Sequence, residues 1–120
     1  MAIDSFRLSE KAKTQLTKLK AKTGITQWNI LCRWAFCLSL KEETIPPNED
    51  IATNSNIEMT WKTFGGERQD LYYALLKQRL IIDGIDLSEK NVVTYFKLHL
   101  HRGISYLSLK VNSIESLVEL

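Results

Sequence analysis

Apolar residues recur every three or four positions along residues 9–23, and this spacing predicts an amphipathic helix. Its apolar stripe, which begins just before the helix, consists of Leu8, Ala12, Leu16 and Leu19. Ser9 is placed to cap the first turn, and Gly24 can adopt the left-handed conformation that often ends a helix. Residues 3–8 alternate and predict a short β-strand. Since one strand cannot stand alone, it must pair with a later strand or with its copy in a second subunit.

Residues 27–40 predict a second helix, with Thr26 as its cap, that is apolar on nearly every face. Such a helix is either central in the core or shared with another subunit. A chain of this size has little of its own to wrap around it, which favours an oligomer. The aromatic residues Trp28, Trp34 and Phe36 could stack on nucleobases, but packing in a core or interface is the more common role of aromatics among aliphatics.

Residues 42–56 read as an acidic surface linker, because adjacent prolines exclude a helix and asparagines suit turns. Residues 57–62 alternate and predict a strand. A third helix is predicted over residues 67–82, and we expect its core side to carry Leu71, Leu75 and Ile82.

Ser88 is placed to cap a fourth helix over residues 89–111. Gly103 inside this helix marks either the close approach of another helix or a bend. We expect residues 112–120 to extend the helix or to fray.

The chain has 120 residues, of which 44% are hydrophobic and 25% charged, and this length and composition are typical of a globular domain with one core. The sequence therefore predicts a mainly α single domain over residues 1–120. It divides into a basic strand-helix-helix segment (1–41), the linker (42–56), and a segment with a short strand and two further helices (57–120).

Charge is unevenly distributed along the chain. Residues 1–41 contain eight basic and two acidic residues, a net charge of +6, so the remainder is −4 against a whole-chain value of +2. Helical spacing places Lys11, Lys18 and Lys22 along one edge of the apolar stripe, and Lys13 and Lys20 along the other. Mobile ammonium groups suit the phosphate backbone, and the scarcity of aromatics among them favours duplex over single-stranded DNA. The candidate DNA-binding residues are Arg7, Lys11, Lys13, Lys18, Lys20, Lys22 and Arg68. The alternative is a solvated helix whose lysines only aid solubility.

Arg68 enters this set because Gly65 and Gly66 precede a predicted helix start, where free amides can bind an anion. The pattern lacks the lysine and hydroxyl of a phosphate loop. A tight turn is the favoured interpretation, and an anion-binding turn is the second.

The sequence contains no recognisable catalytic or metal-binding set. His99 and His101 are two residues apart, so on a helix their rings diverge, and the same holds for Cys32 and Cys37 at a spacing of five. The cysteines are most simply buried apolar thiols, and free thiols fit a reducing compartment. We expect a protein that is not an enzyme, has no cofactor or metal and does not bind a membrane. Because no secretory or membrane-spanning pattern is present, we expect it to be cytoplasmic.

The order of strand, helix, Thr23-Gly24-Ile25-Thr26 turn and apolar helix resembles the ribbon-helix-helix module of small DNA-binding repressors. This resemblance covers about the first third of the chain. It implies strands paired between two chains, outward Ser5 and Arg7 reading bases, and a phosphate held by the amides of residues 26–28.

A second resemblance covers nearly the whole chain. The motifs that carry it are Arg7-Leu8-Ser9-Glu10-Lys11-Ala12, Trp28-Asn29-x-Leu31-Cys32-Arg33-Trp34-Ala35-Phe36-Cys37-Leu38-Ser39-Leu40, Ile45-Pro46-Pro47, Glu58-Met59-x-Trp61-Lys62-Thr63-Phe64-Gly65-Gly66-Glu67 and His99-Leu100-His101-Arg102-Gly103. Together they resemble the DndE family, small subunits of the bacterial system that replaces a non-bridging phosphate oxygen of DNA with sulfur.

The DndE resemblance implies a non-catalytic subunit that binds duplex DNA, with a leaning toward nicked duplex. It also implies a homo-oligomer, which we expect to be a tetramer. The chemistry would belong to partners that resemble a cysteine desulfurase, an iron–sulfur reductase and an ATPase. Two alternatives remain open: a sequence-specific ribbon-helix-helix regulator, and an assembly scaffold of the modification complex.

Overall fold

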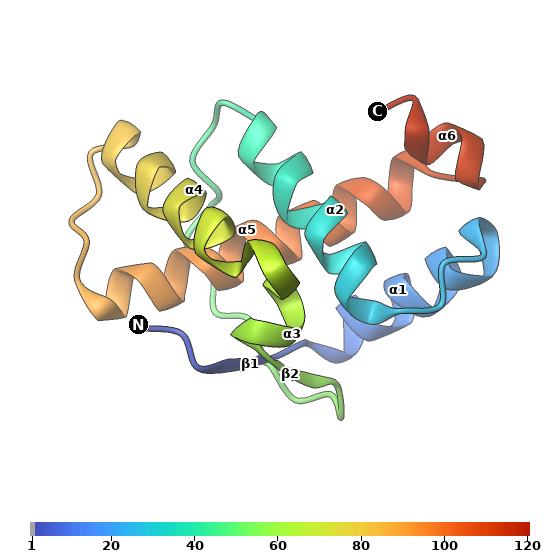
Figure 1. Cartoon of the computed structure of the whole chain (residues 1–120), viewed down its shortest axis with the longest axis horizontal. Helices are drawn as coiled ribbons and strands as arrows, with labels where there is room; N and C mark the ends of the chain where they lie inside the picture. Colours follow the sequence, from blue (N-terminus) through green and yellow to red (C-terminus); the bar gives the residue numbers. More distant parts are fainter. Residues whose placement is uncertain (1) are drawn as a thin grey trace.

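The longest helix, α5, is central in the fold, and α1, α2 and α4 all pack against it (Figure 1). The computed structural model describes residues 2–120 and measures about 38 × 30 × 29 Å. Its elements are β1 (Ser5–Arg7), α1 (Glu10–Thr23), α2 (Trp28–Lys41), β2 (Glu58–Thr60), α3 (Trp61–Gly65), η1 (Gly66–Arg68), α4 (Gln69–Ile82), α5 (Glu89–Lys110) and α6 (Ile114–Val118). The predicted mainly helical single domain is confirmed. Within residues 2–120, no helix is long and apolar enough to cross a bilayer.

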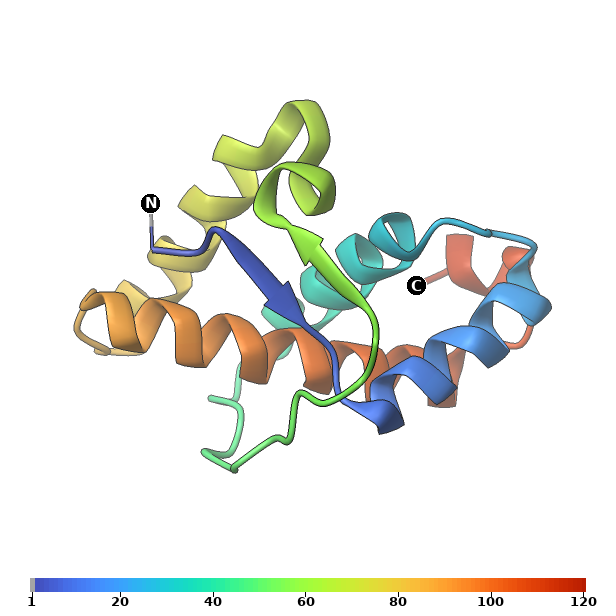
Figure 2. The ribbon, with the colours of Figure 1, turned by 90° about the horizontal axis from the view of Figure 1, so that it is seen from below.

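Helix α1 begins and ends where its capping residues predict. The Ser9 hydroxyl accepts a hydrogen bond from the Ala12 amide at 3.0 Å. Gly24 ends the helix with φ of 76°, a left-handed conformation that costs glycine little. The apolar stripe is fully buried, and α1 packs beside α5 (Figure 2).

Helix α2 makes the most extensive contact with α5, and Gly103 is the reason they approach so closely. A Cβ atom at position 103 would lie 1.8 Å from the Ala35 carbonyl oxygen, so only glycine fits at this crossing. This confirms the first of the two roles predicted for Gly103. The expected Thr26 cap is wrong, because the chain stays extended through Gln27, which precedes the helix without a side-chain capping bond.

The N-terminal strand pairs within the chain. β1 and β2 are antiparallel, with Phe6 opposite Met59 and Arg7 opposite Glu58. The predicted strand over residues 57–62 is too long at its end. Thr60 caps a short helix by accepting a hydrogen bond from the Thr63 amide, so Trp61 begins α3 instead of extending the strand.

An aromatic cluster joins the sheet to the helices. Phe64 and Phe96 are at its centre, and their ring centroids lie 4.9–5.7 Å from each other and from those of Phe6, Phe36 and Trp61. Phe36 is fully buried here, whereas Trp34 on the opposite face of α2 is 37% exposed. Helix α2 is therefore central on one face and open on the other.

The predicted core side of the third helix is wrong. Helix α4 buries Leu76, Leu80 and Arg79, while Leu71 and Ile82 are 48% and 71% exposed. Apolar residues occupy both faces of this helix, so periodicity could not choose between them. The buried side also carries Arg79, which bonds there to Asp83 and to the Leu40 carbonyl.

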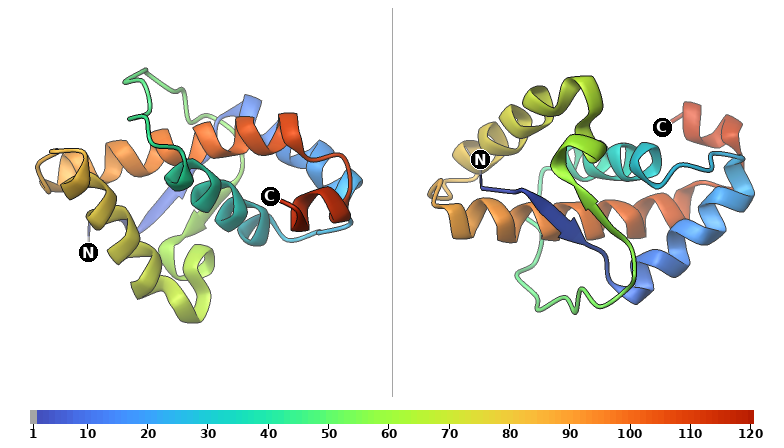
Figure 3. Two further views of the ribbon diagram at one scale, coloured as in Figure 1. Left: turned by 90° about the horizontal axis from the view of Figure 1, so that it is seen from above. Right: turned by 60° about the horizontal axis from the view of Figure 1, so that its bottom comes forward.

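The last residues neither extend α5 nor fray. The Ser113 and Ser116 side chains form a capping box that starts the separate helix α6, and Leu117 is buried. Helix α6 lies against α1 (Figure 3).

Candidate DNA-binding surface

The five lysines of α1 divide into two rows on either side of its buried stripe. The first lysine row is Lys11, Lys18 and Lys22, and all three side chains are exposed. No hydrogen bond or ion pair joins them to any residue from 2 to 120. At 1.5 Å per residue the row extends about 16 Å along the helix, enough to meet several phosphates of one strand.

The second lysine row, Lys13 and Lys20, is half-buried and already bonded. The Lys13 ammonium donates to the Asn56 side-chain oxygen at 2.7 Å. The Lys20 ammonium lies 3.9 Å from the centroid of the Trp28 ring, a cation–π contact. Helical spacing predicts the two rows, and the structure adds that the side chains of the second row have partners within the chain.

Arg7 lies on β1 and is engaged within the sheet. Its guanidinium donates to the Glu58 carboxylate at 2.6 Å and to the Ser55 carbonyl at 2.8 Å. The Ser5 hydroxyl also donates to Glu58, at 3.3 Å. Because Arg7 and Glu58 are opposite each other in the ladder, their pairing needed the strand register, which the sequence does not provide.

Arg68 is exposed at the end of η1, apart from the α1 rows. Gly66 has φ of 58°, so the two glycines form a tight turn. Arg33 holds this turn from α2 by donating to the Phe64 carbonyl at 2.9 Å. These features favour the tight-turn interpretation, and the structure does not bring Arg68 together with the lysines of α1.

The two histidines bond to different parts of the fold. The Ser9 amide donates to His101 Nε2 at 3.2 Å, and His101 Nδ1 donates to the Lys97 carbonyl at 2.8 Å, so this ring joins α5 to the start of α1. His99 Nδ1 is 2.9 Å from the Ser39 hydroxyl in the core. Burial, together with the charges of Arg102 and Arg79, lowers the pKa of His99 to about 4. Both rings thus bond to other segments of the fold, and within residues 2–120 no group of three His, Cys, Asp or Glu side chains could hold a metal ion.

The cysteines also lie apart. Cys32 is buried, and burial raises the pKa of its thiol to about 12. Cys37 is exposed, so the expectation of a buried thiol is wrong at this position. It lies on the open face of α2, which the sequence could not distinguish from the packed face.

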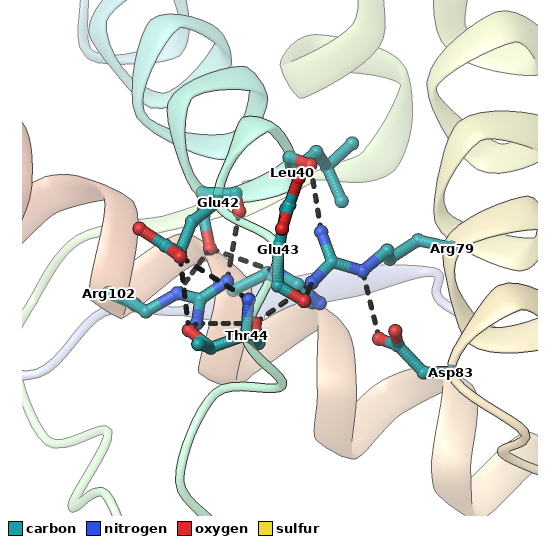
Figure 4. Close-up of polar contacts among 9 residues, drawn as sticks. Leu40, Glu42, Glu43, Thr44, Arg79, Asp83 and Arg102 are labelled. Atoms are coloured by element: carbon teal, nitrogen blue, oxygen red, sulfur yellow. Dashed lines mark hydrogen bonds and ion pairs between the residues drawn. The ribbon is translucent and has the colours of Figure 1, made fainter.

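A pair of arginines, which the sequence analysis did not single out, fixes the chain as it leaves α2 (Figure 4). Arg79 donates to the Leu40 carbonyl at 2.8 Å and pairs with Asp83 at 2.9 Å. Arg102 donates to the Ser39 carbonyl at 2.9 Å. Both guanidiniums donate to the Thr44 carbonyl at 2.8 Å. These bonds hold carbonyls in the last turn of α2 and in the chain just after it. They occupy two cations that a charge count would assign to the surface.

Comparison with known proteins places these features in a family. The model of the family described as DNA sulphur modification protein DndE matches residues 5–115. No curated protein matches the chain significantly.

Two solved structures are similar. The crystal structure of DndE from Escherichia coli B7A, described as involved in DNA phosphorothioation modification, is 28% identical, with a TM-score of 0.74 over 89% of this chain and 98% of that one. The structure of a DndE mutant is 24% identical, with a TM-score of 0.67 over 87% and 95% of the two chains, and shows a shared fold. Since the family model spans nearly the whole chain, this protein belongs to the DndE family of the DNA phosphorothioation system.

Proposed function

We propose that this chain is a non-catalytic subunit that binds duplex DNA for the phosphorothioation machinery, using the first lysine row. The observation that carries the proposal is that Lys11, Lys18 and Lys22 are exposed along one side of α1 and bonded to none of residues 2–120. Such ammonium groups bind backbone phosphates without reading bases, because they displace condensed counterions. Lys13 and Lys20 contribute less, since contact with DNA would compete with their bonds to Asn56 and Trp28.

A mobility-shift titration across salt concentrations tests this function. We expect K11A/K18A/K22A to weaken duplex binding at least tenfold and to reduce the slope of log K against log salt by about three per subunit. The matched control K41A/K62A/K77A removes the same charge from α2, α3 and α4 and should lose less than threefold. Equal losses by the two variants, or none, would contradict the proposal.

The same titration on intact and nicked duplexes tests a preference for nicked DNA. A nick makes a duplex easier to bend across several subunits, so nicked DNA should bind more tightly if the subunits wrap it. Equal affinities would remove this part of the proposal.

The sequence-specific regulator is the weaker alternative, because base reading needs Ser5 and Arg7 free. Both bond to Glu58 instead. Selection from a random duplex pool separates the two functions: a sharp consensus would favour the regulator.

An assembly scaffold without DNA contact is supported by the exposed apolar residues Trp34, Leu71 and Ile82, which suit protein contacts. Its partners would be reductase-like and ATPase-like subunits of the system. If K11A/K18A/K22A supported normal DNA modification in cells, the scaffold would replace DNA binding as the proposed function.

A further inference from the structure

Residues 45–54, which we call the acidic strap, cross the side of the molecule between α2 and β2 (Figures 2 and 3). Both ends are held by hydrogen bonds. Thr44 is held by Arg79 and Arg102, and the Ser55 amide donates to the Leu8 carbonyl at 3.0 Å. Between these anchors no residue of the strap hydrogen-bonds to any other described residue. The strap is therefore tied down at its ends and unbonded along its length.

The strap presents two carboxylates to cavities that contain lysines. Glu49 and Asp50 line a cavity of about 570 Å³ with Lys11 of the first lysine row. They also line a cavity of about 460 Å³ with Lys90 and Lys97 of α5. No ion pair within 4.0 Å joins these groups, so carboxylates and ammonium groups share the lining of each cavity without direct contact.

Other charged or titratable residues also line the first cavity, and together they leave its net charge unchanged. Glu10 and Arg102 contribute one charge of each sign, and His101 is neutral because both ring nitrogens are bonded in that form. Glu49 and Asp50 are thus the anions that the strap itself adds over Lys11 and over the two lysines of α5.

An exposed carboxylate and a phosphodiester carry the same single negative charge and favour the same ammonium partners. We propose that the acidic strap is an internal competitor for DNA: Glu49 and Asp50 line, with Lys90 and Lys97, the space that backbone phosphates would take next to the first lysine row. Lys90 and Lys97 extend the DNA-binding surface from α1 onto α5, and the strap keeps this part of the surface weak until it is displaced. The inference rests on the proposed DNA binding.

Duplex affinity of E49Q/D50N at about 50 mM salt, where screening is moderate, tests the inference. We expect this variant to bind duplex DNA at least about threefold more tightly than wild type, because repulsion of phosphate and competition for the lysines are both removed. The matched control E67Q/D70N makes the same charge change at two exposed positions of η1 and α4, and should change affinity less than twofold.

The partners of the strap are tested by a double-mutant cycle. K90A/K97A should weaken DNA binding at least threefold more in the E49Q/D50N background than in wild type, because only then are these lysines free for phosphate. Equal losses in the two backgrounds would overturn the inference. So would unchanged affinity of E49Q/D50N, or an equal gain by E67Q/D70N.

The two proposals fail in different ways. If wild type binds DNA through the first lysine row but E49Q/D50N binds no tighter, the strap is not a competitor and the proposed function stands. If neither wild type nor any variant binds DNA, both proposals fall together.

Discussion

At the scale of single residues, Gly103 shows how one missing side chain sets the distance between two helices. We predict that G103A destabilises the protein by about 3 kcal/mol or more, because a methyl group 1.8 Å from the Ala35 carbonyl oxygen must push α2 and α5 apart. Denaturant unfolding measures the loss. The control L109A, at an 81% exposed position of the same helix, should cost less than about 0.5 kcal/mol. A similar small cost for G103A would contradict the close packing.

His99 makes stability depend on pH. Its native pKa of about 4 lies below the ordinary value of 6.5, so the unfolded chain takes up the proton first as pH falls. The stability that the neutral His99 ring contributes is therefore complete above pH 6.5 and is lost as pH falls toward 4. Between pH 7 and pH 5 we expect a loss on the order of 2 kcal/mol in the free energy of unfolding from this residue.

The variant H99N isolates this effect, because an asparagine amide oxygen can take the place of Nδ1 opposite Ser39 and does not titrate. Its unfolding free energy should fall less than that of wild type over the same pH range, whatever its absolute stability. Identical pH profiles for the two proteins would show that His99 is not the titrating group.

At the scale of elements, we expect two ion pairs of similar length, Arg79–Asp83 and Arg7–Glu58, to contribute different amounts to the free energy of unfolding. Arg79 and Asp83 are more than nine-tenths buried, whereas the Arg7 and Glu58 side chains are 42% and 49% exposed. R79A leaves the buried Asp83 carboxylate and the Leu40 and Glu43 carbonyls without their partner, while the Thr44 carbonyl keeps Arg102, so we expect a loss of about 3 kcal/mol or more.

R7A is the comparison, and it should cost less than about 1 kcal/mol because water replaces an exposed ion pair readily. Thermal and denaturant unfolding of both variants measures the difference. Equal costs would mean that the Arg79 cluster does not fix the end of α2.

At the scale of the whole molecule, apolar side chains remain exposed on α2 and α4, at Trp34, Leu71 and Ile82. We expect the chain to assemble into a tetramer through such faces, with a mass about four times 13.9 kDa by light scattering. Such assembly would gather several lysine rows on one duplex and raise their joint affinity. DNA binding should therefore weaken when the protein is diluted below the dissociation constant of the oligomer.

Charged substitutions locate the interface. L71E/I82E should lower the measured mass and weaken DNA binding together, while the control L109E should change neither. A monomeric wild type, or an unchanged mass for L71E/I82E, would contradict assembly through α4.

The sequence determined those features that depend on near neighbours. Ser9 and Gly24 mark the two ends of α1, because capping bonds join residues three or four positions apart. The net charge of residues 1–41 likewise needs no structure. The pattern failed for α4, where both faces are apolar, and at Trp61, where the Thr60 cap turned a predicted strand into a helix.

Only the tertiary structure decided which basic residues remain open to a ligand. The bonds from Lys13 to Asn56 and from Arg7 to Glu58 join residues more than 40 positions apart. The Arg79 and Arg102 contacts with Thr44 are likewise long-range. The charge of a side chain follows from the sequence alone. Its bonding partner depends on how distant segments pack, and local spacing does not predict that packing. For this protein the sequence located a basic helix, and the fold determined which of its lysines have no bonding partner among residues 2–120.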